Sequence, residues 1–377
     1  MKILFISMPS IHFTKWIESI NNPNLELYWF DVMSRGEIEV NAQITQFVDW
    51  KKRKRAPIKG EHFLYKKAPF LHQKIKSFVE VTESEKLIEI IQSIQPDIVH
   101  SFEMQGCSYP ILKAMNQFKN IKWIYSCWGS DFFYYQNFYL HKRKISQVLR
   151  RIDYLITDCN RDYNLAKKMG FKGDYLGLIP GGVCCDTGGY DAYKLPLEER
   201  KIILVKGYQL QFGRAMSVIE ALLKMDDLSD YEVVVFGAHT SVYNFIKEKD
   251  LPWQVYHRSA LSNEQVLQLM GKAIVYIASS ISDGIPNTLL EAISMQAFPI
   301  QTNPGNATAE LIEHGKNGFM IQNPENSDEI KSLIQLALSN PQMLLNAQTI
   351  NSILAKEKLN CVVNRKKINL IYTSLNN

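Results

Sequence analysis

The sequence predicts an α/β protein in which a doubly wound parallel sheet occurs twice. In both halves, short apolar segments of strand length alternate with segments of helix length, which is the pattern of parallel βαβ units. The chain has 377 residues, of which 46% are hydrophobic, and this is enough for two cores. Its richest glycine cluster lies between the halves, at residues 180–190, and indicates a hinge.

The order of the elements follows from this alternation. In the first half we predict strands at residues 3–7, 25–30, 98–101, 123–126, 154–157 and 176–179, and a helix at residues 83–95. In the second half we predict strands at residues 202–205, 231–236, 274–278 and 298–301, and a helical region from about residue 327 that Asn340-Pro341 interrupts. We expect domains at residues 1–185 and 186–355, and a C-terminal helix at residues 356–377 that crosses back to the first domain. No internal repeat is evident, which excludes solenoid architectures.

The composition excludes several classes of protein. No apolar run approaches the roughly 18 residues that a membrane-spanning helix needs. The apolar run at the N-terminus is too short for a secretory signal, so we read it as a strand and expect a cytosolic protein. The six cysteines have no C-x-x-C spacing, which predicts free thiols and argues against a zinc site or a disulfide framework.

Positive charge is concentrated in the first half of the chain. Residues 1–185 have 26 lysines and arginines against 18 acids, a net charge of +8, so the remainder carries −3. The densest basic run is at residues 51–55, and a second lies at residues 141–144. Such clusters suit anionic lipid headgroups or a lipid-linked phosphate, and the alternative is a solvated surface. We do not expect nucleic acid as a partner, because the basic runs lack interleaved aromatic residues and a recognisable binding module.

The most informative segment is at residues 282–292, where one acid, Asp283, precedes a helix and a second, Glu291, lies inside it. Pro286 suits the first helical position, and the amides of the first turn would hold a diphosphate. Gly284 would let the backbone approach a ligand closely. The residues that we expect to bind a nucleotide sugar are Gly284, Ile285, Pro286, Asn287, Thr288, Leu289 and Glu291. The alternative is an ordinary strand–loop–helix corner in which Asp283 caps the helix and Glu291 is solvated.

Together with the two sheets and the glycine cluster, this pair of acids resembles the donor motif of the retaining glycosyltransferases of family 4, in which seven residues separate two acids. The resemblance continues through a glycine turn at residues 301–305. It then extends over residues 310–321, which begin with a Glu and contain a G-x-x-G loop. It is concentrated in residues 200–325. It implies the GT-B fold, which is two Rossmann-like domains with a donor site in the second.

The resemblance also implies cationic residues that bind the donor diphosphate. The family has an Arg and a later Lys in the loop after the first strand of the donor domain, and here those positions hold Tyr208 and Arg214. We expect Arg214 to keep the phosphate contact, because its guanidinium fork suits phosphate oxygens. We expect Lys206 to supply the second charge. Asp283 would hold sugar hydroxyls.

On the acceptor side, Ser126-Cys127-Trp128-Gly129-Ser130-Asp131 resembles a strand end where the family often has H-G-x-D. Trp128 stands at the usual His position, and His12, after the first strand, is a candidate replacement. The alternative for His12 is a structural role at a helix start. Asp131 is either a site residue or a helix N-cap.

The implied reaction is transfer of a sugar with retention from a UDP- or GDP-linked donor to a carbohydrate or lipid-linked acceptor in cell-surface polysaccharide synthesis. The donor is a substrate, so we expect no cofactor, and no metal, because Arg214, Lys206 and the helix amides would stabilise the leaving diphosphate. We also expect peripheral contact with the inner membrane face. The alternatives are a nucleotide-sugar epimerase and a catalytically silent scaffold; a phosphorylase lacks a suitably placed lysine for pyridoxal phosphate.

Overall fold

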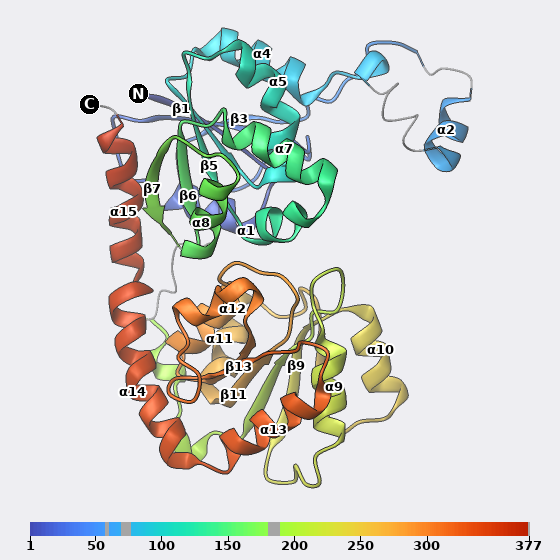
Figure 1. Cartoon of the computed structure of the whole chain (residues 1–377), viewed down its shortest axis with the longest axis vertical. Coiled ribbons are helices and arrows are strands. Elements are labelled where there is room, and N and C mark those ends of the chain that lie inside the picture. Colours follow the sequence, from blue (N-terminus) through green and yellow to red (C-terminus); the bar gives the residue numbers. More distant parts are fainter. Residues whose placement is uncertain (57–59, 69–76, 180–188, 376–377) are drawn as a thin grey trace. The chain divides into compact units, whose positions relative to one another are not determined.

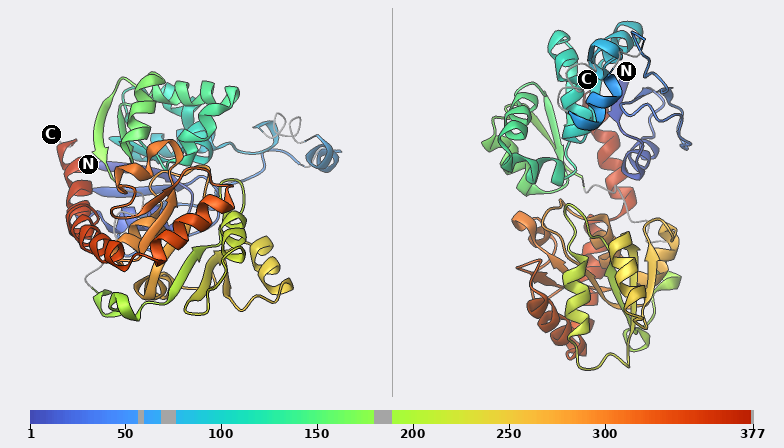
Figure 2. Two further views of the ribbon diagram at one scale, coloured as in Figure 1. Left: turned by 60° about the horizontal axis from the view of Figure 1, so that its bottom comes forward. Right: turned by 90° about the vertical axis from the view of Figure 1, so that its right-hand side faces the viewer.

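The computed structural model describes residues 1–56, 60–68, 77–179 and 189–375. The chain forms two compact units: unit 1 comprises Met1–Thr157, Tyr163–Gly177 and Asn369–Asn377, and unit 2 comprises Asp158–Asp162 and Leu178–Ile368. Each unit has a parallel sheet covered by helices on both faces, so the predicted fold class is confirmed (Figures 1 and 2). The glycine cluster predicted to be a hinge lies largely outside the described residues.

The sheet of unit 1 has the strand order β3-β2-β1-β4-β5-β6-β7. Its strands are β1 (Lys2–Ser7), β2 (Glu26–Asp31), β3 (Thr45–Phe47), β4 (Ile98–Phe102), β5 (Lys122–Ser126), β6 (Tyr154–Thr157) and β7 (Asp174–Leu178). The six predicted strands are confirmed to within two residues at each end. The prediction missed β3, because this edge strand has three partly exposed residues and no apolar run.

Alternate residues of β1 build the two halves of the core in unit 1. Leu4 and Ile6 face a cluster that includes residues of α4 (Glu83–Ile94), α5 (Tyr109–Gln117) and α7 (Tyr139–Leu149). Phe5 points the other way and contacts rings of α1 (Ile11–Glu18) and α15 (Cys361–Ser374). The predicted helix at residues 83–95 is α4, which begins with a capping box between Thr82 and Glu85. The described residues of the first half also form α2 (Glu61–Lys67), α6 (Ser130–Phe133) and α8 (Asn160–Lys168).

The sheet of unit 2 has the order β10-β9-β8-β11-β12-β13. Its strands are β8 (Ile202–Lys206), β9 (Glu232–Ala238), β10 (Gln254–His257), β11 (Ala273–Ala278), β12 (Phe298–Thr302) and β13 (Phe319–Ile321). The four predicted strands are confirmed. The prediction missed β10 and β13, which are short edge strands.

Helices cover both faces of this second sheet. Val205 and Val235 pack in a cluster with α9 (Ala215–Leu223), α10 (Thr240–Glu248), α13 (Ser327–Leu338) and α14 (Pro341–Lys358). Leu204 and Val234 pack on the opposite face with α11 (Asn263–Lys272) and α12 (Asn287–Ser294). The predicted interruption at Asn340-Pro341 separates α13 from α14, where Pro341 takes the first helical position.

The cysteines correct one prediction. Cys107, Cys127 and Cys159 are buried free thiols, as expected, but Cys361 is disulfide-bonded. No helix within the described ranges combines the length and the apolar character that are needed to cross a bilayer.

Candidate functional site

Two loops at the carboxyl edge of the sheet in unit 2 are bonded to each other. The loop after β8 and the loop after β11 are joined by hydrogen bonds from Ile281 N–H to Phe212 O (2.9 Å) and from Arg214 N–H to Ser279 O (2.8 Å). The structure therefore brings the loop of Arg214 beside the loop that carries Asp283. Ligands of open α/β sheets bind at such an edge, beyond the carboxyl ends of the strands.

The hydroxyl group of Tyr276, on β11, lies within electrostatic range of both acids of the motif. This hydroxyl donates to Thr288 Oγ1 at 2.7 Å. Burial raises the pKa of Tyr276, and the nearby charges of Glu291 and Asp283 add to the shift. Asp283 is half-buried, and its Oδ1 accepts from the N–H of Gly284 at 2.9 Å. Tyr276 thus fixes Thr288 at the start of α12, and the N–H of Gly284 orients the carboxylate of Asp283.

Glu291 is buried rather than solvated, because only 7% of it is exposed. Its Oε1 accepts from Asn263 Nδ2 at 2.9 Å, and Asn263 is the first residue of α11. This contact fixes one oxygen of the carboxylate. No motif marked Asn263 in the sequence, and its position at a helix start was the available signal.

The start of α12 differs from the prediction in two respects. Pro286 is the residue before the helix, with an extended ψ of 132°, and not the first helical residue. The N–H of Leu289 donates to Pro286 O at 2.9 Å, so this amide does not face a ligand. The expected amide cradle at Asn287, Thr288 and Leu289 is therefore smaller than the sequence suggested, because the first turn closes on Pro286.

A contact within the protein requires glycine at position 284. A Cβ at this position would overlap the carboxylate of Asp158, and the backbone of Gly284 does not adopt a positive φ. Asp158 Oδ2 accepts from the N–H of Ile285 at 3.1 Å, so Ile285 also has a protein partner. Glycine at position 284 is thus explained by the space that Asp158 occupies, and its close approach to a ligand stays a prediction.

Arg161 ties the Asp283 loop to its neighbour, and sequence reasoning missed it. Its Nη1 donates to Asp283 O at 2.7 Å and to Pro304 O at 2.8 Å. Its other nitrogens donate to both carboxylate oxygens of Asp162, at 2.8 and 3.0 Å. The available signal was the polar run Asp158-Cys159-Asn160-Arg161-Asp162 directly after a buried strand.

Among the residues that the structure describes, this run also contains a group of side chains that could hold a metal ion. Ligand atoms of Asp158, Cys159 and Asp162 lie within 4.8 Å of one another. Burial raises the pKa of Asp158, and the neighbouring charge of Asp162 raises it further. Because Arg161 already occupies both oxygens of Asp162, the arrangement suits an internal ion pair better than a cation site.

The two cationic residues of the site lie at the end of β8 and on the loop after it: Lys206 is the last residue of β8, and Arg214 directly precedes α9. Arg214 Nε donates to Glu325 Oε1 at 2.8 Å, and its Nη1 donates to Gly213 O at 2.8 Å. The Lys206 ammonium lies 5.9 Å from the ring centroid of Tyr208. Ion pairs of this exposed kind are worth about 0–1 kcal/mol, so Arg214 can exchange Glu325 for a phosphate at little cost.

His239 belongs to the same edge and was also missed. It follows β9, and its Nδ1 accepts from the N–H of Gln209 at 3.0 Å. Its ring packs edge-on against Tyr208, with centroids 4.8 Å apart. A His directly after a buried strand that ends in Gly-Ala was the signal in the sequence.

In unit 1, the structure brings His12 and Trp128 together but gives Asp131 a structural role. The rings of His12 and Trp128 lie 5.4 Å apart, at the carboxyl ends of β1 and β5. The Asp131 carboxylate is buried and accepts from the N–H groups of Met104 (2.9 Å) and Trp128 (3.0 Å) and from Tyr125 Oη (2.6 Å). Asp131 is the second residue of α6, so it is not the N-cap, which is Gly129.

Glu103, at the end of β4, is a second acid at this edge that the sequence did not reveal. Its φ is 65°, and its carboxylate accepts from the N–H groups of Gln105 and Gly106. Burial and the adjacent Asp131 carboxylate raise the pKa of Glu103 to about 7. Such a shift is common at functional sites.

Two family models match most of the chain. The model described as "Glycosyl transferases group 1" matches residues 194–352, and the model described as "Glycosyl transferase 4-like" matches residues 2–159. A search of curated proteins gives no match.

Solved structures have the same fold over nearly the whole chain. HepE of Anabaena, crystallised with UDP and glucose, is 14% identical with a TM-score of 0.68, over 99% of this chain and 100% of that one. Sucrose-phosphate synthase of Thermosynechococcus elongatus is 13% identical with a TM-score of 0.72, over 99% and 98% of the two chains. A glycosyltransferase of Rickettsia africae is 17% identical with a TM-score of 0.66, over 99% and 98%. Identities this low establish the fold alone.

Proposed function

Because this chain belongs to the group 1, family 4-like glycosyltransferases of the GT-B fold, we propose that it moves a sugar from a nucleotide-diphosphate donor to a carbohydrate or lipid-linked acceptor, with retention at the anomeric carbon. The observation that carries this proposal is the pair of hydrogen bonds that joins the loop of Asp283 to the loop of Arg214, directly before α12, the helix that carries Glu291. This arrangement offers carboxylates for hydroxyl groups next to a cation for phosphate.

Breaking the bond between sugar and phosphate places negative charge on the leaving diphosphate. In this proposal, Arg214 and Lys206 stabilise that charge, together with the first turn of α12, and no metal ion takes part. One such donor contributes about 3–4 kcal/mol in comparable anion holes. Asp283 holds the sugar through its hydroxyl groups, and the acceptor hydroxyl attacks from the face that the diphosphate leaves, with a phosphate oxygen as its base.

We propose UDP or GDP as the nucleotide of the donor. The crystallised complexes of HepE with UDP and with UDP-glucose support a UDP-sugar, because that protein has the same fold throughout. We further propose a cytoplasmic enzyme of cell-surface polysaccharide synthesis that contacts an anionic membrane. The exposed basic run Lys51–Arg55 in unit 1 supports this contact.

The test is donor turnover in matched pairs of variants. Asp283→Asn and Arg214→Ala should each lower the release of UDP from a UDP-sugar by about 100-fold or more, since each removes a contact of the transition state. Asp250→Asn is the control for the first, because Asp250 is an exposed acid at the other end of the sheet. Lys224→Ala is the control for the second, because Lys224 forms a comparable surface ion pair with Asp328 at 2.7 Å.

Normal turnover in Asp283→Asn or Arg214→Ala would refute the assignment. Conversion of the sugar without an acceptor would indicate the epimerase. Nucleotide binding without turnover across a broad panel of acceptors would indicate the scaffold. Nuclear magnetic resonance of the product would show the anomeric configuration and so decide whether transfer proceeds with retention.

A further inference from the structure

The start of α7 exposes apolar side chains that the proposed donor site does not use. Tyr139 and Leu140 are the first two residues of this helix, and they are 76% and 73% exposed. Phe138, directly before the helix, is 46% exposed and packs against Tyr134, with ring centroids 5.3 Å apart. Single exposed apolar residues are ordinary, whereas an exposed apolar patch marks an interaction surface.

The buried face of α7 fixes this exposure. Ile145, Val148 and Leu149 are fully buried in the core of unit 1, so a rotation that turned the start of the helix inward would expose them. The Tyr109 hydroxyl donates to His141 O at 3.1 Å and holds the first turn of α7 against α5. The exposed apolar start of α7 is therefore a built feature of the surface.

Cations share the exposed face of α7 with the apolar side chains. Lys142, Arg143 and Lys144 are exposed, and none of them forms an ion pair in the part of the chain that the structure describes. Side chains four residues apart lie on the same face of a helix. Arg143 therefore lies beside Tyr139, and Lys144 lies beside Leu140.

The charge around α7 has a single sign. Residues 132–152 contain five lysines and arginines and no acid. Apolar side chains followed by cations on one face are typical of a helix that lies in a membrane interface, where the apolar groups enter the boundary of the acyl chains and the cations contact anionic headgroups. Tyrosine is enriched at this boundary. The segment thus combines both contacts that such a surface offers.

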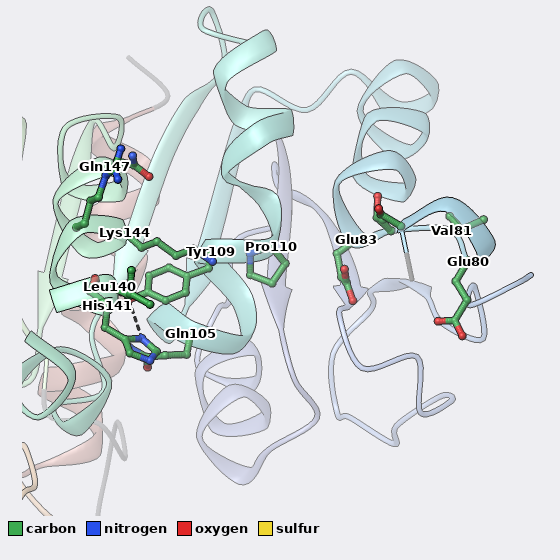
Figure 3. A pocket seen from close by; sticks show the side chains of 13 residues that line it. Glu80, Val81, Glu83, Gln105, Tyr109, Pro110, Leu140, His141, Lys144 and Gln147 are labelled. Atoms are coloured by element: carbon green, nitrogen blue, oxygen red, sulfur yellow. Dashed lines mark hydrogen bonds between the residues drawn. The ribbon is translucent and has the colours of Figure 1, made fainter. Parts of the chain in front are cut away.

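A cavity of about 890 Å³ adjoins this face, and Leu140 and Lys144 line it from α7 (Figure 3). Two acids line its other side, across Pro110, and the fold accounts for both. Glu80 has an interaction within the protein, and Glu83 lies in the first turn of α4, where the helix dipole stabilises a negative charge. A headgroup that contacts Lys144 therefore has room on the α7 side of the cavity.

We infer that the start of α7 docks on a membrane of anionic phospholipids, with residues 138–140 in the interface and residues 142–144 against the headgroups. Charge complementarity selects this partner over a second copy of the chain, because two copies that met through this face would bring like charges together. The inference rests on the membrane contact of the proposed function and assigns it to α7. It does not depend on the transfer reaction.

Co-sedimentation of the full chain with vesicles tests the inference. We expect binding to phosphatidylcholine vesicles that contain phosphatidylglycerol to be at least about tenfold tighter than binding to phosphatidylcholine alone. Tyr139→Ser/Leu140→Ser should weaken the binding at least about tenfold, because two apolar side chains no longer leave water. The matched control is Leu345→Ser/Ile353→Ser, which changes two exposed apolar residues of α14 and should bind as the wild type does.

The contribution of charge is measured with a second pair of variants. Arg143→Gln/Lys144→Gln should weaken binding about tenfold or more and reduce its dependence on salt. Lys51→Gln/Lys52→Gln removes two exposed charges of the other basic run of unit 1 and should weaken binding less. All substituted positions are exposed, so the midpoint of thermal unfolding should equal that of the wild type and show that the variants fold.

Wild-type binding in both α7 variants, with loss only in Lys51→Gln/Lys52→Gln, would overturn the inference and leave the membrane contact of the proposed function in place. A wild-type chain that binds neither kind of vesicle would overturn both. Self-association that Tyr139→Ser/Leu140→Ser abolishes, without vesicle binding, would show that a second copy covers this face. Release of UDP from a UDP-sugar is measured without vesicles, so failure of the transfer reaction and failure of the docking are told apart.

Discussion

The carboxylate of Asp158 occupies the space that a side chain at position 284 would need. All three atoms nearest to a Cβ built on Gly284 belong to Asp158, and Asp158 Oδ2 accepts from the adjacent N–H of Ile285 at 3.1 Å. The glycine beside the first acid of the motif is thus explained by a buried acid far away in the sequence. This contact, together with that of Arg161, sets the backbone on which Asp283 is placed.

The first prediction concerns this contact. Gly284→Ala should lower the free energy of unfolding by about 1–3 kcal/mol, because the added methyl group overlaps a buried carboxylate. Denaturant unfolding measures the change. Gly189→Ala is the control, since no atom lies within 4 Å of a Cβ there. Asp158→Ala introduced into Gly284→Ala should recover part of the loss, and strict additivity of the two substitutions would contradict the explanation.

The second prediction treats Arg161 as a positioning residue. Arg161→Lys keeps the charge but cannot reach Asp283 O, Pro304 O and both oxygens of Asp162 at once. We expect kcat to fall about 10- to 100-fold with little change in donor KM, because the Asp283 loop is displaced from its productive position. Assays are run well below the melting temperature. A rise in KM at unchanged kcat would instead indicate that Arg161 acts on donor binding.

The third prediction is a loss of stability in acid that originates at His100. The His100 ring is hydrogen-bonded through Nδ1 to Tyr372 Oη (2.7 Å) and through Nε2 to Ser126 Oγ (2.7 Å). Tyr372 Oη also accepts from Trp16 Nε1–H at 2.8 Å. Burial lowers the pKa of His100 from 6.5 to about 3.

Below pH 6.5 the unfolded chain therefore binds a proton at His100 that the folded chain does not bind. The contribution of His100 to stability falls as the pH drops from 6.5 toward 3, by roughly 4–5 kcal/mol in total. Urea unfolding followed by tryptophan fluorescence reports on unit 1, which holds five of the six tryptophans. His100→Gln should reduce this dependence of the free energy of unfolding on pH. An unchanged slope would show that other groups cause it.

The fourth prediction has the opposite sign and concerns Glu103. Its pKa is raised from 4.5 to about 7 in the folded state, so the unfolded chain ionises first as the pH rises. The contribution of Glu103 to stability should decrease between pH 4.5 and 7, by about 3 kcal/mol, and then level off, which opposes the contribution of His100 where the two pH ranges overlap. Glu103→Gln should remove this decrease in the same fluorescence assay. The matched variant is Glu89→Gln, an exposed acid of α4, which should leave the slope as it is in the wild type.

Strand periodicity was enough to predict the two sheets, because parallel strands buried on both faces read as continuous apolar runs. The edge strands β3, β10 and β13 were not predicted, because each is short and because β3 and β10 are half-exposed. The acids Asp283 and Glu291 were found because their spacing places them around a helix start. The start of the helix was predicted one residue too early, at Pro286. The ψ angle of Pro286 excludes it from the helix, and local composition does not determine that angle.

The sequence by itself determined the order of strands and helices and the family of the chain, because both depend on local pattern and on motifs within short segments. Tertiary structure alone decided the partners of those motifs: Asp158 under Gly284, Arg161 on Asp283, and Asn263 on Glu291. These contacts join residues 28 to 126 positions apart. Only the folding of the sheet brings such residues together, because a hydrogen bond depends on distance in space and no local preference encodes it.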